Sequence, residues 1–146
     1  MPSVFSFSKE QLGLLETSSS WLKISLILND QEASSLAEFT NSESGTLLYR
    51  ATRDGFTANA FHANCDGKAK TITIISTNNH VFGGYTSAAW NKSGDYIKDA
   101  SAFTFSLRRN GISNFEKFLI KNPDTAIIGH QHYGPIFGGG NGNAIN

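Results

Sequence analysis

Apolar and polar side chains alternate along residues 103–108, and this two-residue period is typical of a strand with one buried face. One face carries Phe103, Phe105 and Leu107, and the other carries Thr104, Ser106 and Arg108. Asn110 and Gly111 then favour a tight turn into a second strand over residues 114–121. The pattern therefore predicts a β-hairpin in this part of the chain.

Further strands are predicted from other apolar runs. Residues 71–76 and 80–87 are rich in β-branched and aromatic side chains, and Asn78 and Asn79 between them tolerate the positive φ of a hairpin turn. Residues 125–134 indicate one more strand. Two earlier runs are expected to be a strand through Tyr49 that ends at a polar turn over residues 53–55, and a strand-like or buried segment over residues 21–30.

Two helices are predicted ahead of these hairpins. The first covers residues 31–39, where Ala33, Leu36 and Ala37 recur at helical spacing, and Asp30 is placed to cap it. The second begins at the N-cap Thr57, ends before Gly67 and buries Phe61 and Cys65. Short strands, two helices and no βαβ rhythm predict an α+β fold, with an antiparallel sheet system and flanking helices.

Composition narrows the class of protein. The 146 residues suffice for one domain, and residues 1–20 differ in composition from the rest. We therefore expect an N-terminal tail or the end of an upstream region over 1–20, and a domain over 21–146. The formal net charge is zero, and the small basic group Arg108, Arg109 and Lys117 does not indicate nucleic-acid binding. With no signal peptide and no long apolar run, we expect a cytoplasmic protein without membrane insertion.

A glycine-rich stretch, "GPIFGGGNGN", covers residues 134–143. Gly134 and Gly139 match the outer glycines of a phosphate-binding P-loop, but Gly140 and Asn141 stand where that loop needs Lys and Ser or Thr. We therefore interpret these glycines as structural residues that let a strand turn or pass close to a neighbour. No cofactor is expected.

Four ordered segments carry a family resemblance: "LLYRATRDGFTANAFHANCD" over residues 47–66, "TITIISTNNHVFGGYTS" over 71–87, "DASAFTFSL" over 99–107 and "YGPIFGGG" over 133–140. Together with Trp90, they resemble the TLDc domain of the oxidation-resistance proteins. The resemblance implies a β-sandwich flanked by helices, a role in protection against oxidative damage, and binding to subunits of the vacuolar-type proton-pumping ATPase. It also implies that Gly55, Gly83, Gly84, Gly138, Gly139 and Gly140 are structural.

TLDc domains continue beyond the glycine-rich element, whereas this chain stops at Asn146, so we expect a C-terminally incomplete domain. In that case the strands around Phe103, Phe105 and Ile127 or Ile128 would expose apolar faces and drive self-association.

Three groups of residues are candidates for a site. Cys65 and His62 could act as a thiol nucleophile and its base, and the alternative is a buried small hydrophobe. His130 and His132 could ligate a metal if His62 or His80 joined them, although two ligands do not make a site and no metal is expected. The candidate binding residues Arg50, Arg53 and Asp54 lie at a turn, where Asp54 can instead serve turn chemistry and Arg53 can pair with a carboxylate.

Two functional hypotheses follow. The first is a non-catalytic protein-interaction module of the TLDc type, because no catalytic constellation is complete. The alternative is an enzyme that uses Cys65 thiol chemistry, or a hydrolase of unknown substrate.

Overall fold

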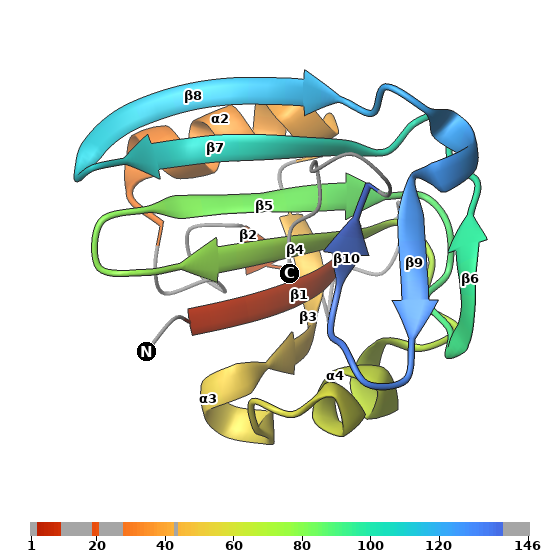
Figure 1. The fold of residues 1–146 in the computed structure, drawn as a ribbon. Coiled ribbons are helices and arrows are strands. Elements are labelled where there is room, and N and C mark those ends of the chain that lie inside the picture. Colours follow the sequence, from red (N-terminus) through yellow and green to blue (C-terminus); the bar gives the residue numbers. More distant parts are fainter. Residues whose placement is uncertain (1–2, 10–18, 21–27, 43, 139–146) are drawn as a thin grey trace.

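A computed structural model describes residues 3–9, 19–20, 28–42 and 44–138 (Figure 1). A seven-stranded antiparallel sheet has the order β2-β3-β1-β4-β5-β7-β8. Its strands are β1 Ser3–Lys9, β2 Ser19–Ser20, β3 Ser44–Arg50, β4 Thr71–Ser76, β5 Val81–Thr86, β7 Phe103–Arg109 and β8 Ile112–Leu119. A three-stranded sheet has the order β10-β9-β6, with β6 Ser93–Ile97, β9 Ile127–His130 and β10 Ile136–Phe137.

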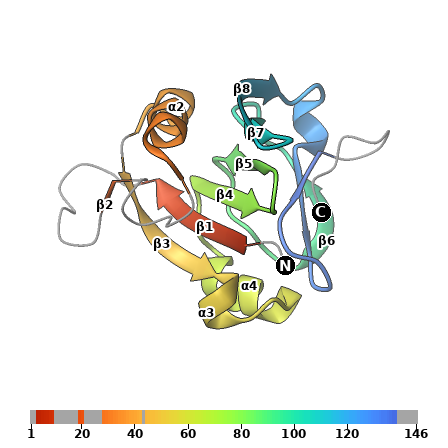
Figure 2. The same ribbon diagram turned by 90° about the vertical axis from the view of Figure 1, so that its left-hand side faces the viewer.

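The helices lie outside the large sheet. They are α2 Asp30–Thr40, α3 Ala51–Asp54 and α4 Ala58–Cys65, with a 3₁₀ turn over Pro123–Thr125. Figure 2 shows α2 and the three-stranded sheet on opposite sides of the seven-stranded sheet. The expected α+β fold with an antiparallel β-sandwich and flanking helices is confirmed.

Both predicted hairpins are present. β4 pairs with β5 through a turn that contains Asn78 and Asn79, and β7 pairs with β8 through Asn110 and Gly111. The φ angles of Asn110 and Gly111 are 53° and 77°, which suits a tight turn between twisted strands. The amide of Gly111 donates to the carbonyl of Asn79, so the two hairpin turns are joined.

Several elements differ from the sequence prediction. Residues 1–20 were expected to form a tail, whereas Ser3–Lys9 form β1, which pairs with both β3 and β4. The cap of α2 is Asn29 rather than Asp30, because Asn29 accepts from the amide of Glu32 while the Glu32 carboxylate accepts from the amide of Asn29. Thr57 caps α4 as predicted. The expected run over residues 21–30 lies mostly outside the described residues.

Two cores lie on the two faces of the large sheet. One packs α2 against Ile72, Ile74, Phe105 and Leu107, and the other packs the small sheet and α4 around Trp90, Phe61 and Phe137. We expected Phe103, Phe105 and Ile127 to form exposed apolar faces, but among the described residues these three side chains are buried. Large exposed apolar side chains lie instead on β8, where Ile112, Phe115, Phe118 and Leu119 are 40–74% exposed.

Candidate functional site

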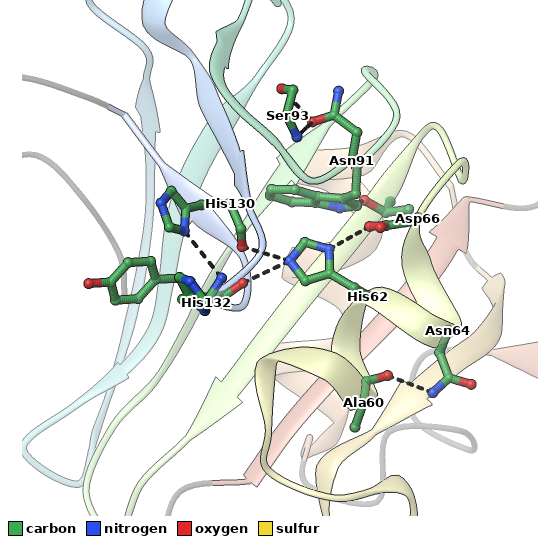
Figure 3. Close-up of polar contacts among 11 residues, drawn as sticks. Ala60, His62, Asn64, Asp66, Asn91, Ser93, His130 and His132 are labelled. Carbon is green, nitrogen blue, oxygen red and sulfur yellow. Dashed lines mark hydrogen bonds and ion pairs between the residues drawn. The ribbon is translucent and has the colours of Figure 1, made fainter.

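His62 joins helix α4 to the connection between β9 and β10 (Figure 3). Its ring is buried, and Nδ1 lies 2.6 Å from Oδ1 of Asp66, one helical turn further on. Nε2 lies 2.8 Å from the carbonyl oxygen of His130 and 2.9 Å from that of Tyr133. Carbonyl oxygens only accept, so Nε2 donates and has no lone pair to offer a nucleophile. The contacts of His62 support a structural role.

Cys65 lies on the same helix and is fully buried. It packs in the core that contains Tyr49, Phe61 and Trp90. A reactive thiol needs an accessible, electropositive setting and a base with a free nitrogen. Burial removes the first condition and the hydrogen bonds of His62 remove the second, so the geometry favours the interpretation of Cys65 as a small hydrophobe.

The other histidines do not converge on one point. The rings of His130 and His132 have centroids 5.5 Å apart, but only His130 belongs to β9, and its Nδ1 accepts from the amide of His132. His80 lies at the β4–β5 turn, where Nδ1 accepts from the amide of Asn110. Within the described part of the chain, no three His, Cys, Asp or Glu side chains are grouped as metal ligands would be.

Arg50, Arg53 and Asp54 form a local turn structure around α3. The Asp54 carboxylate accepts from the backbone amide of Arg50 at 3.0 Å and from the Arg53 guanidinium at 2.7 and 2.8 Å. The hydrogen bond from Arg53 is the main reason that the pKa of Asp54 is lowered. Asp54, the last residue of α3, thus accepts from the amide of Arg50, the residue that precedes this helix.

The structural glycines fall into two kinds. Gly55 and Gly138 have φ angles of 109° and 76°, which side-chain-bearing residues rarely adopt. Gly83 and Gly84 lie in β5, where an added Cβ would collide with the Thr73 carbonyl oxygen at Gly83 and with the Phe137 ring at Gly84. Gly84 therefore lets the small sheet approach the large one. Gly139 and Gly140 lie outside the described residues.

Asp99 is a buried carboxylate that was noted in the sequence only as the first residue of "DASAF". It accepts hydrogen bonds from Thr86 Oγ1, from the amide and hydroxyl of Ser87, and from the amide and hydroxyl of Ser101, at 2.6 to 3.0 Å. Burial raises the pKa of Asp99, but the hydrogen bonds from Ser87, Thr86 and Ser101 outweigh this effect and lower the pKa to about 2. Asp99 thereby joins the end of β5 to the segment before β7.

A groove of about 280 Å³ lies over the β5–β7–β8 part of the large sheet. It is lined by His80, Phe82, Thr104, Phe105, Ser106, Arg108, Arg109 and Phe118. The three basic residues noted in the sequence, Arg108, Arg109 and Lys117, have different surroundings in the fold. Lys117 lies over the Phe103 ring, and Arg108 pairs with the buried Glu32, whereas Arg109 is exposed beside the groove. Of the exposed side chains of β8, Phe118 lines the groove and Ile112 lies opposite the groove residue Arg109.

The comparisons with known proteins give one match. The family model of the TLDc domain matches residues 21–146. No curated protein and no solved structure matches. Among the described residues, no helix has the length and apolar character needed to cross a membrane. Because the family model covers most of the chain, the protein belongs to the TLDc domain family.

Proposed function

We propose that this chain is a non-catalytic protein-interaction module of the TLDc type, which acts in oxidative-stress protection by binding a vacuolar-type proton-pumping ATPase. The observation that supports the proposal is the exposed apolar strand β8, with four large side chains 40–74% exposed, beside the groove on the same sheet. These side chains lie on both faces of β8, with Phe118 opposite Thr104 on the groove face and Leu119 opposite Phe103 on the α2 face. Large exposed apolar side chains mark sites of protein association. The proposal includes a cytoplasmic location.

The contrast with the candidate catalytic residues adds support. Cys65 is buried, both nitrogens of His62 have oxygen partners, and Asp54 is occupied by Arg50 and Arg53. None of these groups combines access to substrate with an activating partner, as nucleophilic or acid–base catalysis requires. The exposed side chains of β8 and the lining of the groove include phenylalanine and arginine, which are residue types enriched in protein interfaces.

Binding to the pump is the direct test. The full chain, labelled and purified, is titrated with the purified cytosolic sector of a vacuolar-type ATPase, and binding is measured by fluorescence anisotropy. We expect saturable binding that unlabelled chain displaces, with a Kd in the micromolar range or tighter, as is usual for a specific interface. The cytosolic sector of a bacterial-type ATP synthase is the control. No saturable binding at 50 μM, or equal binding to the control complex, would overturn the pump as the partner.

A further inference from the structure

β8 is the edge strand of the seven-stranded sheet (Figure 1). It spans eight residues and pairs with β7 on one side, and the described residues supply no strand on its other side. Four of its large apolar side chains are 40–74% exposed. The opposite edge of the same sheet is β2, which has two residues. Among the described strands, β8 is therefore the long edge of this sheet at which another strand can pair.

The two charged side chains of β8 leave its outer edge open. Charged side chains, lysine above all, commonly protect an edge strand. The Lys117 ammonium, however, donates to the carbonyl of Phe39 at 3.4 Å and lies 4.3 Å from the centre of the Phe103 ring, so it is held over the α2 face of the sheet. The Glu116 carboxylate accepts from the side-chain amide of Asn114 on the same strand at 3.2 Å. A strand that pairs in the plane of the sheet displaces neither contact.

The strand register assigns the side chains of β8 to two faces. Phe118 lies opposite Thr104, which lines the groove. Ser113 lies beyond the register shift of the β7–β8 ladder and opposite Arg108, whose guanidinium pairs with Glu32 of α2. Because an odd number of positions separates Phe118 from Ser113, the side chains alternate without interruption along β8. The even-numbered residues of β8 share the groove face, and the odd-numbered residues share the α2 face.

We infer that β8 pairs with β8 of a second copy of this chain, antiparallel and about a two-fold axis perpendicular to the sheet. This axis keeps the two groove faces on one side, so residues from the same face lie opposite each other. Each register is therefore centred on one residue that lies opposite its own copy. Registers centred on Phe115 and Glu116 give the longest ladders, over residues 112–118 and 113–119. The second register sets two glutamates directly opposite each other, which is destabilising, so the ladder is centred on Phe115.

The ladder centred on Phe115 matches the exposed apolar side chains of the two copies. The two Phe115 rings lie opposite each other on the α2 face, and Ile112 lies opposite Phe118 on the groove face. Cross-strand pairs of an aromatic side chain with an aromatic or β-branched one stabilise a sheet. Because the pairing occupies β8 of both copies and the opposite edge is the short β2, the association closes at a dimer.

The polar positions of this ladder are compatible as well. Asn114 lies opposite Glu116 of the second copy, and Ser113 lies opposite Lys117, so no like charges are directly opposed. An asparagine amide carries two N–H donors, so Asn114 can donate to Glu116 of its own strand and to Glu116 of the second copy. The formal net charge of the chain is zero, so its net charge does not oppose the approach of two copies.

Sedimentation velocity of the full chain from about 1 to about 500 μM tests the dimer. We expect a monomer–dimer equilibrium with a Kd in the micromolar range, as is usual for a small interface. Phe115→Ala should weaken the dimer about tenfold. Phe56→Ala changes a phenylalanine of similar exposure outside β8 and should leave the Kd within about twofold of the unaltered chain.

Cysteine cross-linking tests the register. Residues directly opposite in an antiparallel pair have Cβ atoms about 5 Å apart, whereas diagonal neighbours are about 7 Å apart, too far for a disulfide. Phe115→Cys should therefore form a disulfide-linked dimer under mild oxidation at least about tenfold faster than Glu116→Cys. The unaltered chain is the control and should form none, because Cys65 is buried.

Four results would overturn the inference: a chain that stays monomeric at about 500 μM, a dimer that Phe115→Ala leaves unchanged, assemblies larger than a dimer, or faster cross-linking of Glu116→Cys. These results are distinct from those for the proposed partner. If the chain binds the ATPase sector and stays monomeric, the dimer is wrong and the proposed function stands. If the chain dimerises through β8 and the ATPase sector does not bind, the dimer stands and the pump is not the partner.

Discussion

The Trp90→Ala protein is expected to be about 3 to 5 kcal/mol less stable than the unaltered chain. Trp90 is almost fully buried where α4, β10 and the large sheet meet, and its ring makes edge-to-face contacts with Phe61 and Phe137 at centroid distances of 5.5 and 5.6 Å. Its Nε1 also donates to the buried hydroxyl of Thr71 at 2.9 Å. Removing the indole leaves a large cavity between the two sheets and an unsatisfied hydroxyl. Urea denaturation measures the loss.

Two further substitutions identify the cause. Trp90→Phe keeps an aromatic ring and loses the hydrogen bond to Thr71, and it should cost clearly less than the alanine variant. Tyr96→Ala removes a ring that is about half exposed and should change stability by less than about 0.5 kcal/mol. A Trp90→Ala protein as stable as Tyr96→Ala would mean that the packing of the two sheets on Trp90 is wrong.

The second large effect is expected for Asp99→Ala, at about 2 to 4 kcal/mol of lost stability at pH 7. The carboxylate accepts all of the hydrogen bonds from Thr86, Ser87 and Ser101 described above, and Thr86 is fully buried, so water cannot readily replace its partner. Asp124→Ala is the matched control. Asp124 is largely exposed and pairs with the exposed Lys98, so its loss should cost less than about 0.5 kcal/mol.

The low pKa of Asp99 also predicts how its contribution depends on pH. The pKa is about 2 in the folded chain and near 3.8 when unperturbed, so the unfolded state binds the proton first as the pH falls. The stabilisation is therefore fully present above about pH 5 and is lost between about pH 4 and pH 2, by about 2 kcal/mol. In Asp99→Ala, the difference in unfolding free energy from the unaltered chain should shrink over that interval. A difference that is constant from pH 7 to pH 2 would contradict the assignment.

Local pattern predicted the regular parts of the fold well. The alternation of Phe103, Phe105 and Leu107 and the turn residues Asn110 and Gly111 are sufficient for the β7–β8 hairpin, because both signals lie within a few residues. The cap of α2 could also have been found. Glu32 stands three residues after Asn29, and that spacing is the signature of a capping box.

Strand β6 was missed because it lacks a buried side in its own pattern. The residues of β6 are exposed except Ile97, which is partly buried, so its sequence shows no apolar period. β1 alternates serine with apolar residues, and the serine-rich composition of residues 1–20 concealed that period. Pairing between β1 and its neighbours β3 and β4 joins residues about 40 to 70 positions apart, which no local pattern reveals.

The surroundings of the candidate site residues are set by contacts between parts of the chain that are far apart in the sequence. Arg108, Arg109 and Lys117 looked alike in the sequence, and only the fold pairs Arg108 with Glu32, places Lys117 over Phe103 and brings Arg109 to the groove. Asp99 likewise became notable only when the chain folded Thr86 and Ser87 around its carboxylate. Conversely, the thiol hypothesis for Cys65 rested on helical spacing to His62, whose nitrogens the fold directs to other partners.

The central claim is that the chain works through a binding surface and not through thiol chemistry. Survival after peroxide treatment tests it in cells that lack their own TLDc proteins and express the unaltered chain, Cys65→Ala or Arg109→Gln at equal levels. Both purified variants are first shown to melt cooperatively. We expect the unaltered chain and Cys65→Ala to protect the cells equally and Arg109→Gln to lose most of the protection. Protection that is lost in a folded Cys65→Ala protein and kept in Arg109→Gln would contradict this account.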